Sequence, residues 1–339
     1  MNPPDLPSDE DEDQGLTDRE PSPALRPGAS TFTIEGRAAP GLFVVGWVGT
    51  LIGLGLIVIG VLAADQGTSR ILLLAGLFVL GLGLIAGAGS QGIERRARGR
   101  LAYQGPSPFL VLAASVPVTV LTLIIVSLPF VLASVSLDGA FGALLSVSVQ
   151  AVLYLGLVRL LVVDVGALDW RAMGVSRPDR AAIVAMATGA VWALPVVFVT
   201  AIVAAVLISA VPVEPISPLP PTGTTIGFAL SLIAGAIVAP LGEEILFRGF
   251  ATTAWVRGLG VRRGIVLGAL VFAFAHVVTV SGPTAGEALG QAFVAFAARL
   301  PVALALGWIF IRRGTIWASF GLHAAFNGTL LIIAEAASR

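Results

Sequence analysis

The sequence predicts an all-α, polytopic membrane protein of about nine transmembrane helices, and three observations support this fold class. Apolar side chains make up 56% of the 339 residues and charged side chains only 12%, whereas a soluble domain carries about 25% charged residues. The apolar residues gather in nine stretches that approach the roughly 20 residues a helix needs to cross a bilayer. The arginines between these stretches lie almost entirely in alternate connections.

The first 38 residues form a separate, acidic segment. Residues 1–20 contain eight acidic residues against one base, Arg19, and prolines recur among them. Such a segment buries too little apolar surface to offset the entropy lost on ordering, so residues 1–38 are predicted to be a disordered cytoplasmic tail. The acidic start, with no apolar stretch directly after it, is unlike a signal peptide.

The remaining chain divides into two groups of predicted helices. Residues 39–180 contain four spans and a cytoplasmic loop, and residues 181–339 contain five spans that form a C-terminal bundle. Five prolines between Val211 and Thr225 oppose helix formation and separate the fifth span from the sixth. The predicted spans are residues 41–63, 70–90, 108–135, 139–163, 181–211, 225–251, 265–280, 288–311 and 315–336.

Arginine placement orients the predicted helices. With the tail in the cytoplasm, twelve arginines fall in cytoplasmic connections, and only Arg70 and Arg339 fall on the opposite side. Short cytoplasmic loops are enriched in arginine and lysine, so we expect a cell-membrane protein with a cytoplasmic N-terminus and a C-terminus on the opposite side. The twelve arginines lie in the connections 91–107, 164–180, 252–264 and 312–314.

Few ionisable residues remain inside the predicted spans. Such a residue costs about 2.5–3.5 kcal/mol on insertion scales, so those that are retained are candidates for function. Arg159 lies near enough to a helix end for its side chain to reach the interface, and Arg299 is interpreted as structural. The other candidates lie at similar depth on three spans of the C-terminal bundle and can meet in one cavity open to the cytoplasm. They are Glu243, Glu244, Arg248, His276, His323 and Asn327.

Helical spacing separates the roles of these residues. Glu244 and Arg248 are four residues apart and can form an ion pair on one helix face. Glu243 lies about 100° around the helix, which makes it less suited to that pair and leaves it free for chemistry. His323 and Asn327 are also four residues apart and can direct two hydrogen-bond donors at one point, as an oxyanion site requires.

The same residues resemble the motifs of a known family. The run EEILFR that begins at Glu243 is similar to the EExxxR motif of the CPBP family. These are intramembrane glutamic endopeptidases that include the type II CAAX prenyl endopeptidases and bacterial proteins linked to bacteriocin immunity. FAFAH, which ends at His276, resembles the family's FxxxH motif, and HAAFN, which begins at His323, resembles its HxxxN motif. All three occur in the family's order within residues 225–337.

The resemblance implies an intramembrane endopeptidase, a hydrolase similar to the CAAX prenyl proteases. In the family's pattern, Glu243 and His276 activate a water molecule that attacks the scissile carbonyl. The glutamate–arginine pair supports the site, while His323 and Asn327 stabilise the tetrahedral oxyanion. The implied partner is a peptide or protein substrate in or beside the lipid bilayer, and no cofactor is implied.

Three other classes of function stay open. Glu243, His276 and His323 match the two histidines and one carboxylate of a hydrolytic zinc site, which would make the protein a zinc-dependent membrane protease, although no H-E-x-x-H helix is present. Buried glutamate and histidine also relay protons in transporters. Transporters usually have matching repeats, however, and the first five spans contain no counterpart of the polar set. The third class is a membrane scaffold without catalytic activity, but such a role would not explain the polar residues retained inside the spans.

Composition excludes two further classes of site. The formal net charge is zero, which argues against nucleic-acid binding because such proteins need a basic surface. The sequence has no cysteine, so disulfides, thiolate nucleophiles and thiolate metal ligands are absent.

Overall fold

The computed structural model describes residues 34, 36–99, 101–211, 221–278 and 280–338. The disorder predicted for the tail therefore lies almost entirely outside the described residues, as does most of the proline-rich connector. The described part is helical and contains no strand. Its helices are α2 (Pro40–Leu62), α3 (Gln66–Arg98), α4 (Pro108–Leu132), α5 (Ala140–Val158), η2 (Arg159–Val163), α6 (Arg180–Ala210), α7 (Thr225–Leu232), η3 (Ile233–Val238), α8 (Ala239–Glu243), η4 (Glu244–Thr252), α9 (Thr253–Leu259), α10 (Val261–Ala275), α11 (Ala285–Arg313) and α12 (Ile316–Ala337).

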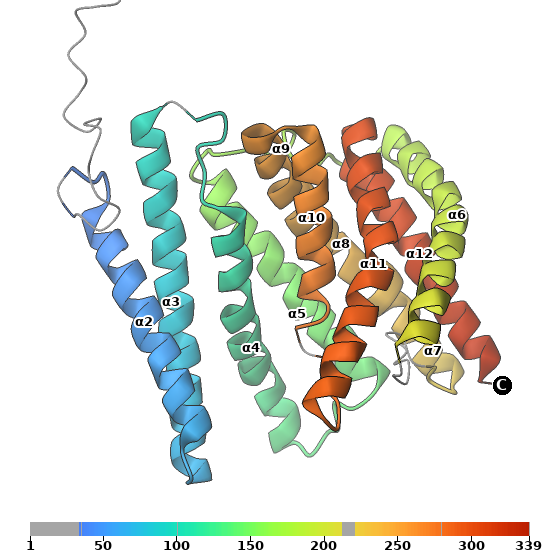
Figure 1. Cartoon of the computed structure of the whole chain (residues 1–339), viewed down its shortest axis with the longest axis horizontal. Coiled ribbons are helices and arrows are strands. Elements are labelled where there is room, and N and C mark those ends of the chain that lie inside the picture. Colours follow the sequence, from blue (N-terminus) through green and yellow to red (C-terminus); the bar gives the residue numbers. More distant parts are fainter. Residues whose placement is uncertain (1–33, 35, 100, 212–220, 279, 339) are drawn as a thin grey trace, which may run out of the picture.

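Eight helices of the described chain are long and apolar enough to cross a membrane, which confirms the predicted all-α, multi-pass class. One of them is the unbroken 35-residue helix Thr225–Leu259, which contains α7 to α9. The predicted seventh span is α10, whose 15 residues fall short of the roughly 20 needed for a full crossing. Figure 1 shows α10 ending before the lower end of the bundle that α4 and α11 reach. The end of α10 thus lies inside the bundle.

The predicted connection 252–264 is a tight turn between two helices. α9 continues to Leu259 and α10 begins at Val261, so that only Gly260 separates them. Gly260 has a φ of 84°, a backbone conformation that glycine adopts readily because it lacks a Cβ atom. The arginines assigned to this connection therefore lie on the ends of helices.

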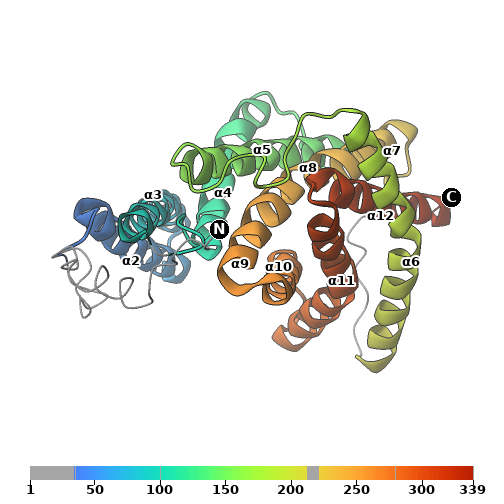
Figure 2. The same cartoon turned by 90° about the horizontal axis from the view of Figure 1, so that it is seen from above.

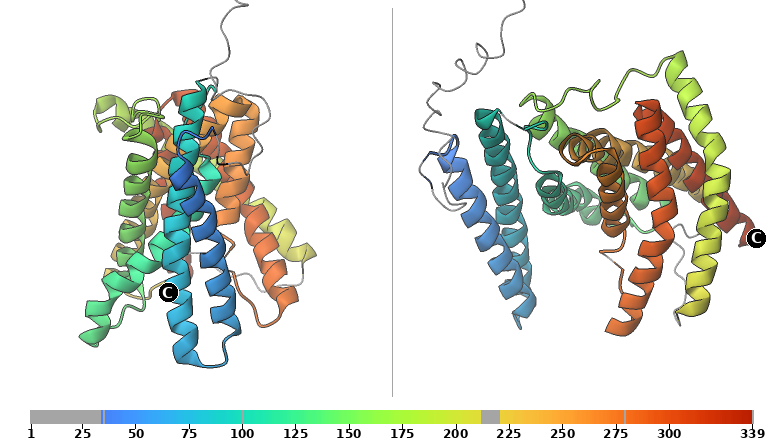
Figure 3. Two further views of the ribbon diagram at one scale, coloured as in Figure 1. Left: turned by 90° about the vertical axis from the view of Figure 1, so that its left-hand side faces the viewer. Right: turned by 45° about the horizontal axis from the view of Figure 1, so that its top comes forward.

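The first two helices form a layer at one edge of the molecule. α2 packs against α3 along its length, and α3 packs against α4. Figures 2 and 3 show the α2–α3 pair beside the rest of the bundle. The buried residues of α2 are Gly46, Gly53 and Gly60, whose spacing puts them on one face. Small residues on such a face allow the close helix contact typical of membrane proteins.

The helix Thr225–Leu259 lies at the centre of the remaining bundle. α5 packs against its α7, η3 and α8 segments, and α12 packs against η3 and η4; Figure 2 shows α8 between α5 and α12. A Cβ atom at Gly242 would lie 2.8 Å from the Cα atom of Ala151 on α5, so only glycine permits this approach. α5, predicted within the segment 39–180, thus directly supports the backbone next to Glu243.

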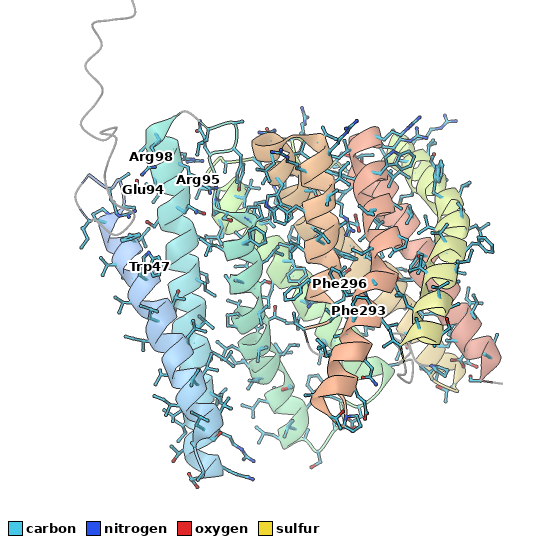
Figure 4. The ribbon with its side chains drawn as sticks, viewed as in Figure 1. Trp47, Glu94, Arg95, Arg98, Phe293 and Phe296 are labelled. Atoms are coloured by element: carbon cyan, nitrogen blue, oxygen red, sulfur yellow. The ribbon has the colours of Figure 1, made fainter. Side chains whose placement is uncertain are left out.

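Several helices carry arginines at the same end of the bundle. Arg95 and Arg98 lie in the last turn of α3, as Figure 4 shows, and Arg312 and Arg313 lie in the last turn of α11. Figure 1 shows these two helix ends at the same, upper end of the molecule as the start of α6 at Arg180. Cations are favourable at helix C-termini, where the helix dipole is negative. We call this the arginine-rich end.

The loop between α3 and α4 is anchored at this end. The Arg95 guanidinium donates to the carbonyl of Gly105 at 2.9 Å. The hydroxyl of Tyr103 is buried and donates to the carbonyl of Pro106 at 2.9 Å. Burial raises the pKa of Tyr103 above its ordinary value, so the phenol stays protonated and keeps this bond.

Candidate active site

The two adjacent glutamates lie where an α-helical segment meets a π-helical one. Glu243 is the last residue of α8 and Glu244 the first of η4, and a second π segment, η3, precedes Pro240. A proline has no backbone N–H and its ring crowds the preceding turn, so wider turns accommodate it within a continuous helix. Single π segments inside α-helices occur frequently at functional sites.

Glu244 and Arg248 form the predicted ion pair, which the structure confirms. Arg248 Nη1 lies 3.1 Å from Glu244 Oε1, and the two side chains are 2% and 0% exposed. Within the described part of the chain, Glu244 Oε2 and Arg248 Nη2 make no hydrogen bond. The pair is therefore sealed in the protein interior.

His323 on α12 bridges both glutamates. Its Nδ1 lies 2.8 Å from Glu244 Oε1, and its Nε2 lies 3.7 Å from Glu243 Oε2. The imidazole is buried, and the close contact with Glu244 sets the orientation of the ring. Nε2 is thereby directed at Glu243.

His276 faces the same oxygen of Glu243 from another helix. It follows directly after α10, and its Nδ1 lies 2.8 Å from the carbonyl oxygen of Phe272. A carbonyl can only accept, so Nδ1 carries the hydrogen of this bond. The other nitrogen, Nε2, lies 3.7 Å from Glu243 Oε2. That separation exceeds a direct hydrogen bond and is one at which a water molecule can bridge the two groups.

Phe272 packs at the centre of this cluster. The Arg248 guanidinium carbon lies 4.0 Å from its ring centroid, and the rings of His276 and His323 lie 4.5 Å and 5.7 Å from it. Its side chain is buried. Phe272 thus packs against three polar side chains of the cluster.

Asn327 lies one turn after His323 but contacts a different group. Its Nδ2 donates to the carbonyl oxygen of Gly235 at 2.8 Å. Gly235 lies in η3, where the wider turns displace backbone carbonyls from the α-helical pattern, so the amide satisfies one of them. The structure therefore brings five of the six candidates together around Glu243 and Glu244, and Asn327 ties α12 to η3 beside them.

The side chains of the cluster differ in exposure. The Glu243 side chain is 13% exposed and that of His276 is 29% exposed, whereas Glu244 and Arg248 are almost fully buried. Glu243 and His276 are therefore the more accessible members of the cluster.

One further charged side chain near Glu243 belongs to no sequence motif. Arg299 of α11 lies within electrostatic range of the Glu243 carboxylate. Arg299 also donates from Nη1 to the carbonyl of Ala295 at 2.9 Å. The position of Arg299 inside a predicted span marked it as a candidate for function. It was interpreted as structural because no sequence motif links its helix, α11, to Glu243.

Among the residues that the structure describes, no three histidine, aspartate or glutamate side chains form an arrangement that could hold a metal ion.

These features define a class of protein: a multi-pass helical membrane protein with a carboxylate–histidine site enclosed by its helices. Residues 225–329 match the family of the type II CAAX prenyl endopeptidase Rce1-like proteins, which confirms the resemblance seen in the motifs. This segment contains all six candidate residues and is a domain of that family, so the chain carries a membrane protease domain. No curated protein and no solved structure matches the chain.

Proposed function

We propose that the protein is an intramembrane glutamic-type endopeptidase in which Glu243 is the general base. One observation carries the proposal: Nε2 of His276 and Nε2 of His323 each lie 3.7 Å from the same oxygen of Glu243. This arrangement directs two imidazole nitrogens at one carboxylate oxygen, the convergence that a shared water molecule requires. The Rce1-like match over residues 225–329 supports protease chemistry at this place.

The reaction uses water as the nucleophile. Glu243, with His276 beside it, takes a proton from the water, and the water oxygen attacks the scissile carbonyl carbon. The carbonyl oxygen becomes an oxyanion in the tetrahedral intermediate. Glu243 then gives its proton to the leaving nitrogen, the carbon–nitrogen bond breaks, and the carboxyl and amino products leave. General acid–base catalysis of this kind contributes roughly 10²–10⁴-fold.

His323 and Asn327 stabilise the oxyanion in this proposal. With protons on both nitrogens, His323 donates to Glu244 from Nδ1 and to the oxyanion from Nε2. Asn327 has two amide hydrogens, and the one that is not donated to Gly235 is directed to the oxyanion. Glu244 and Arg248 are positioning residues, since they contact the other catalytic groups rather than the substrate.

The substrate is a peptide or protein in or beside the membrane, and no cofactor is required. We further propose that the site opens to the cytoplasmic side and that the N-terminus is cytoplasmic and the C-terminus lies opposite. The asymmetry of the arginine-containing connections supports this orientation.

The test compares cells that contain the parent protein with cells that contain Glu243→Gln, which keeps the shape of the side chain. We expect new protein termini in the membrane proteome of the parent cells alone, and purified Glu243→Gln should cleave the substrate so identified at least 100-fold more slowly. Glu287→Gln on the exposed start of α11 is the matched control and should retain full activity. Equal cleavage by Glu243→Gln and the parent would overturn the proposal.

A further inference from the structure

Two helices enclose a small hollow near the arginine-rich end, away from the Glu243 cluster. Trp192 of α6 and Trp308 of α11 pack edge to face, with ring centroids 5.2 Å apart and an interplanar angle of 68°. The hollow has a volume of about 260 Å³ and is lined by these two rings, Ile309, Arg312 and Arg313. It is polar at one side and aromatic at the other.

The arginines of this hollow have no acidic partner in the described part of the chain. Arg312 and Arg313 are absent from its ion pairs, and the Arg312 guanidinium carbon lies 5.3 Å from the centroid of Trp308. Both arginines occupy the last turn of α11. Two positive charges therefore border the hollow without local neutralisation.

The surface below the hollow is apolar. α6 and α11 are both candidate membrane spans, and beyond Trp192 α6 exposes large apolar side chains, among them Leu194, Phe198 and Ile202. The surface changes from apolar side chains to two tryptophans and then to arginines. A phospholipid changes in the matching order, from acyl chains to glycerol to a charged headgroup. Tryptophan side chains favour the headgroup level of a bilayer, and arginines near it attract anionic lipids.

We propose that this hollow binds the headgroup of an anionic membrane phospholipid. Arg312 and Arg313 contact the phosphodiester oxygens, which the planar guanidinium group binds with two parallel hydrogen bonds. Trp192 and Trp308 contact the glycerol and the first carbons of the acyl chains. The lipid bridges α6 and α11, and α6 also packs against α12, the helix that carries His323.

This inference does not rest on the proposed protease activity. A soluble anion such as inorganic phosphate shares the headgroup chemistry but would gain nothing from the tryptophans. The acidic tail of this chain, with eight acidic residues in positions 1–20, is the other anionic group that could cover the arginines. The experiment separates these occupants.

The full-length protein is purified in detergent, and retained phospholipid is measured by native mass spectrometry after addition of phosphatidylglycerol or phosphatidylcholine. We expect the parent to retain phosphatidylglycerol preferentially. Arg312→Gln/Arg313→Gln should lower that preference roughly thirtyfold, because each basic residue near the headgroups contributes roughly fivefold. Arg312→Lys/Arg313→Lys should keep most of it, which shows that a loss in the glutamine variant is not misfolding.

The matched control is Arg262→Gln/Arg263→Gln, an adjacent pair at the start of α10 that does not line the hollow. It should leave the preference unchanged; an equal loss in both variants would mean general surface electrostatics and would overturn the proposal. So would displacement of the lipid by millimolar inorganic phosphate. A lipid adduct that forms only after the eight tail acids are changed to Asn or Gln would assign the hollow to the tail instead.

Discussion

His323 and Glu244 are 79 residues apart in the sequence, yet His323 Nδ1 lies 2.8 Å from Glu244 Oε1. The same carboxylate oxygen also lies 3.1 Å from Arg248 Nη1. One buried oxygen thus positions a cation on its own helix and an imidazole on another. Through this contact the ring of His323 is held with Nε2 towards Glu243, while Glu244 itself stays fully buried.

Arg248→Met should strongly destabilise the protein, because it leaves the buried Glu244 carboxylate without its cation. Loss of one partner of a buried ion pair costs about 3–5 kcal/mol. Glu244→Gln/Arg248→Met removes both charges and keeps an acceptor for His323, so it should recover most of that stability. The measurement is thermal unfolding in detergent.

The control for this cycle is Arg159→Met, which breaks the exposed Arg159–Asp164 pair, whose atoms lie 3.7 Å apart. Exposed pairs contribute about 0–1 kcal/mol, so we expect little change. A double variant no more stable than Arg248→Met would contradict the account of the pair.

Asn327→Ala should lower the cleavage rate roughly 10²–10³-fold, the range for loss of one oxyanion donor. It should also lower the unfolding temperature, because the carbonyl of Gly235 loses its donor. Thr329→Ala removes a hydrogen bond to the carbonyl of Ala325 on the same helix and should leave the rate unchanged. An Asn327→Ala enzyme with lowered stability and a full catalytic rate would assign Asn327 to the support of η3 alone.

Gly242→Val should push α5 away from the helix that carries Glu243. The Cβ atom added at Gly242 would lie 2.8 Å from both Cα and Cβ of Ala151, and overpacking of this kind costs about 1–3 kcal/mol. Ala151→Gly in the same chain should restore part of the stability. Gly156→Ala on α5, where a Cβ atom meets nothing within 4 Å, is the control, and an equal effect there would refute the steric explanation.

Tyr103→Phe should change how stability depends on alkaline pH. The unfolded chain releases the phenol proton near pH 10, while burial raises the pKa of Tyr103 in the folded protein. Stability is therefore fully present below pH 10 and falls as the pH rises, by about 1.4 kcal/mol at pH 11 for this group. Chemical denaturation at pH 8 and pH 11 should show a smaller decrease for Tyr103→Phe than for the parent; identical decreases would exclude this contribution.

Chelation decides between the metal-free mechanism and the zinc alternative. Glu243 as base needs no metal, so we expect cleavage of the identified substrate to continue at the same rate after dialysis against 1,10-phenanthroline. Loss of activity that added zinc restores would instead assign Glu243, His276 and His323 as metal ligands. Parallel measurement of the unfolding temperature shows whether the chelator has damaged the protein.

The sequence was informative about the site where the relevant geometry is local. Glu244 and Arg248 share one helix, so a spacing of four residues sufficed to predict their ion pair. The contact of Asn327 with Gly235 could not be predicted in this way, because it depends on how α12 meets η3. The angle of about 100° between Glu243 and Glu244 was predicted for regular α-helical turns. In the structure the wider turns of the π-helical segment η4 begin at Glu244.

The sequence by itself determined the membrane class, the approximate number of helices and the residues from which the site is built. These properties depend on composition and on the fixed rise and turn of a helix. The tertiary structure decided that α10 ends at Ala275 and that His276 faces Glu243 from the end of that helix. It also decided that Arg299 of α11 lies near Glu243. Those relationships depend on the rotation and packing of separate helices, which no local pattern of residues specifies.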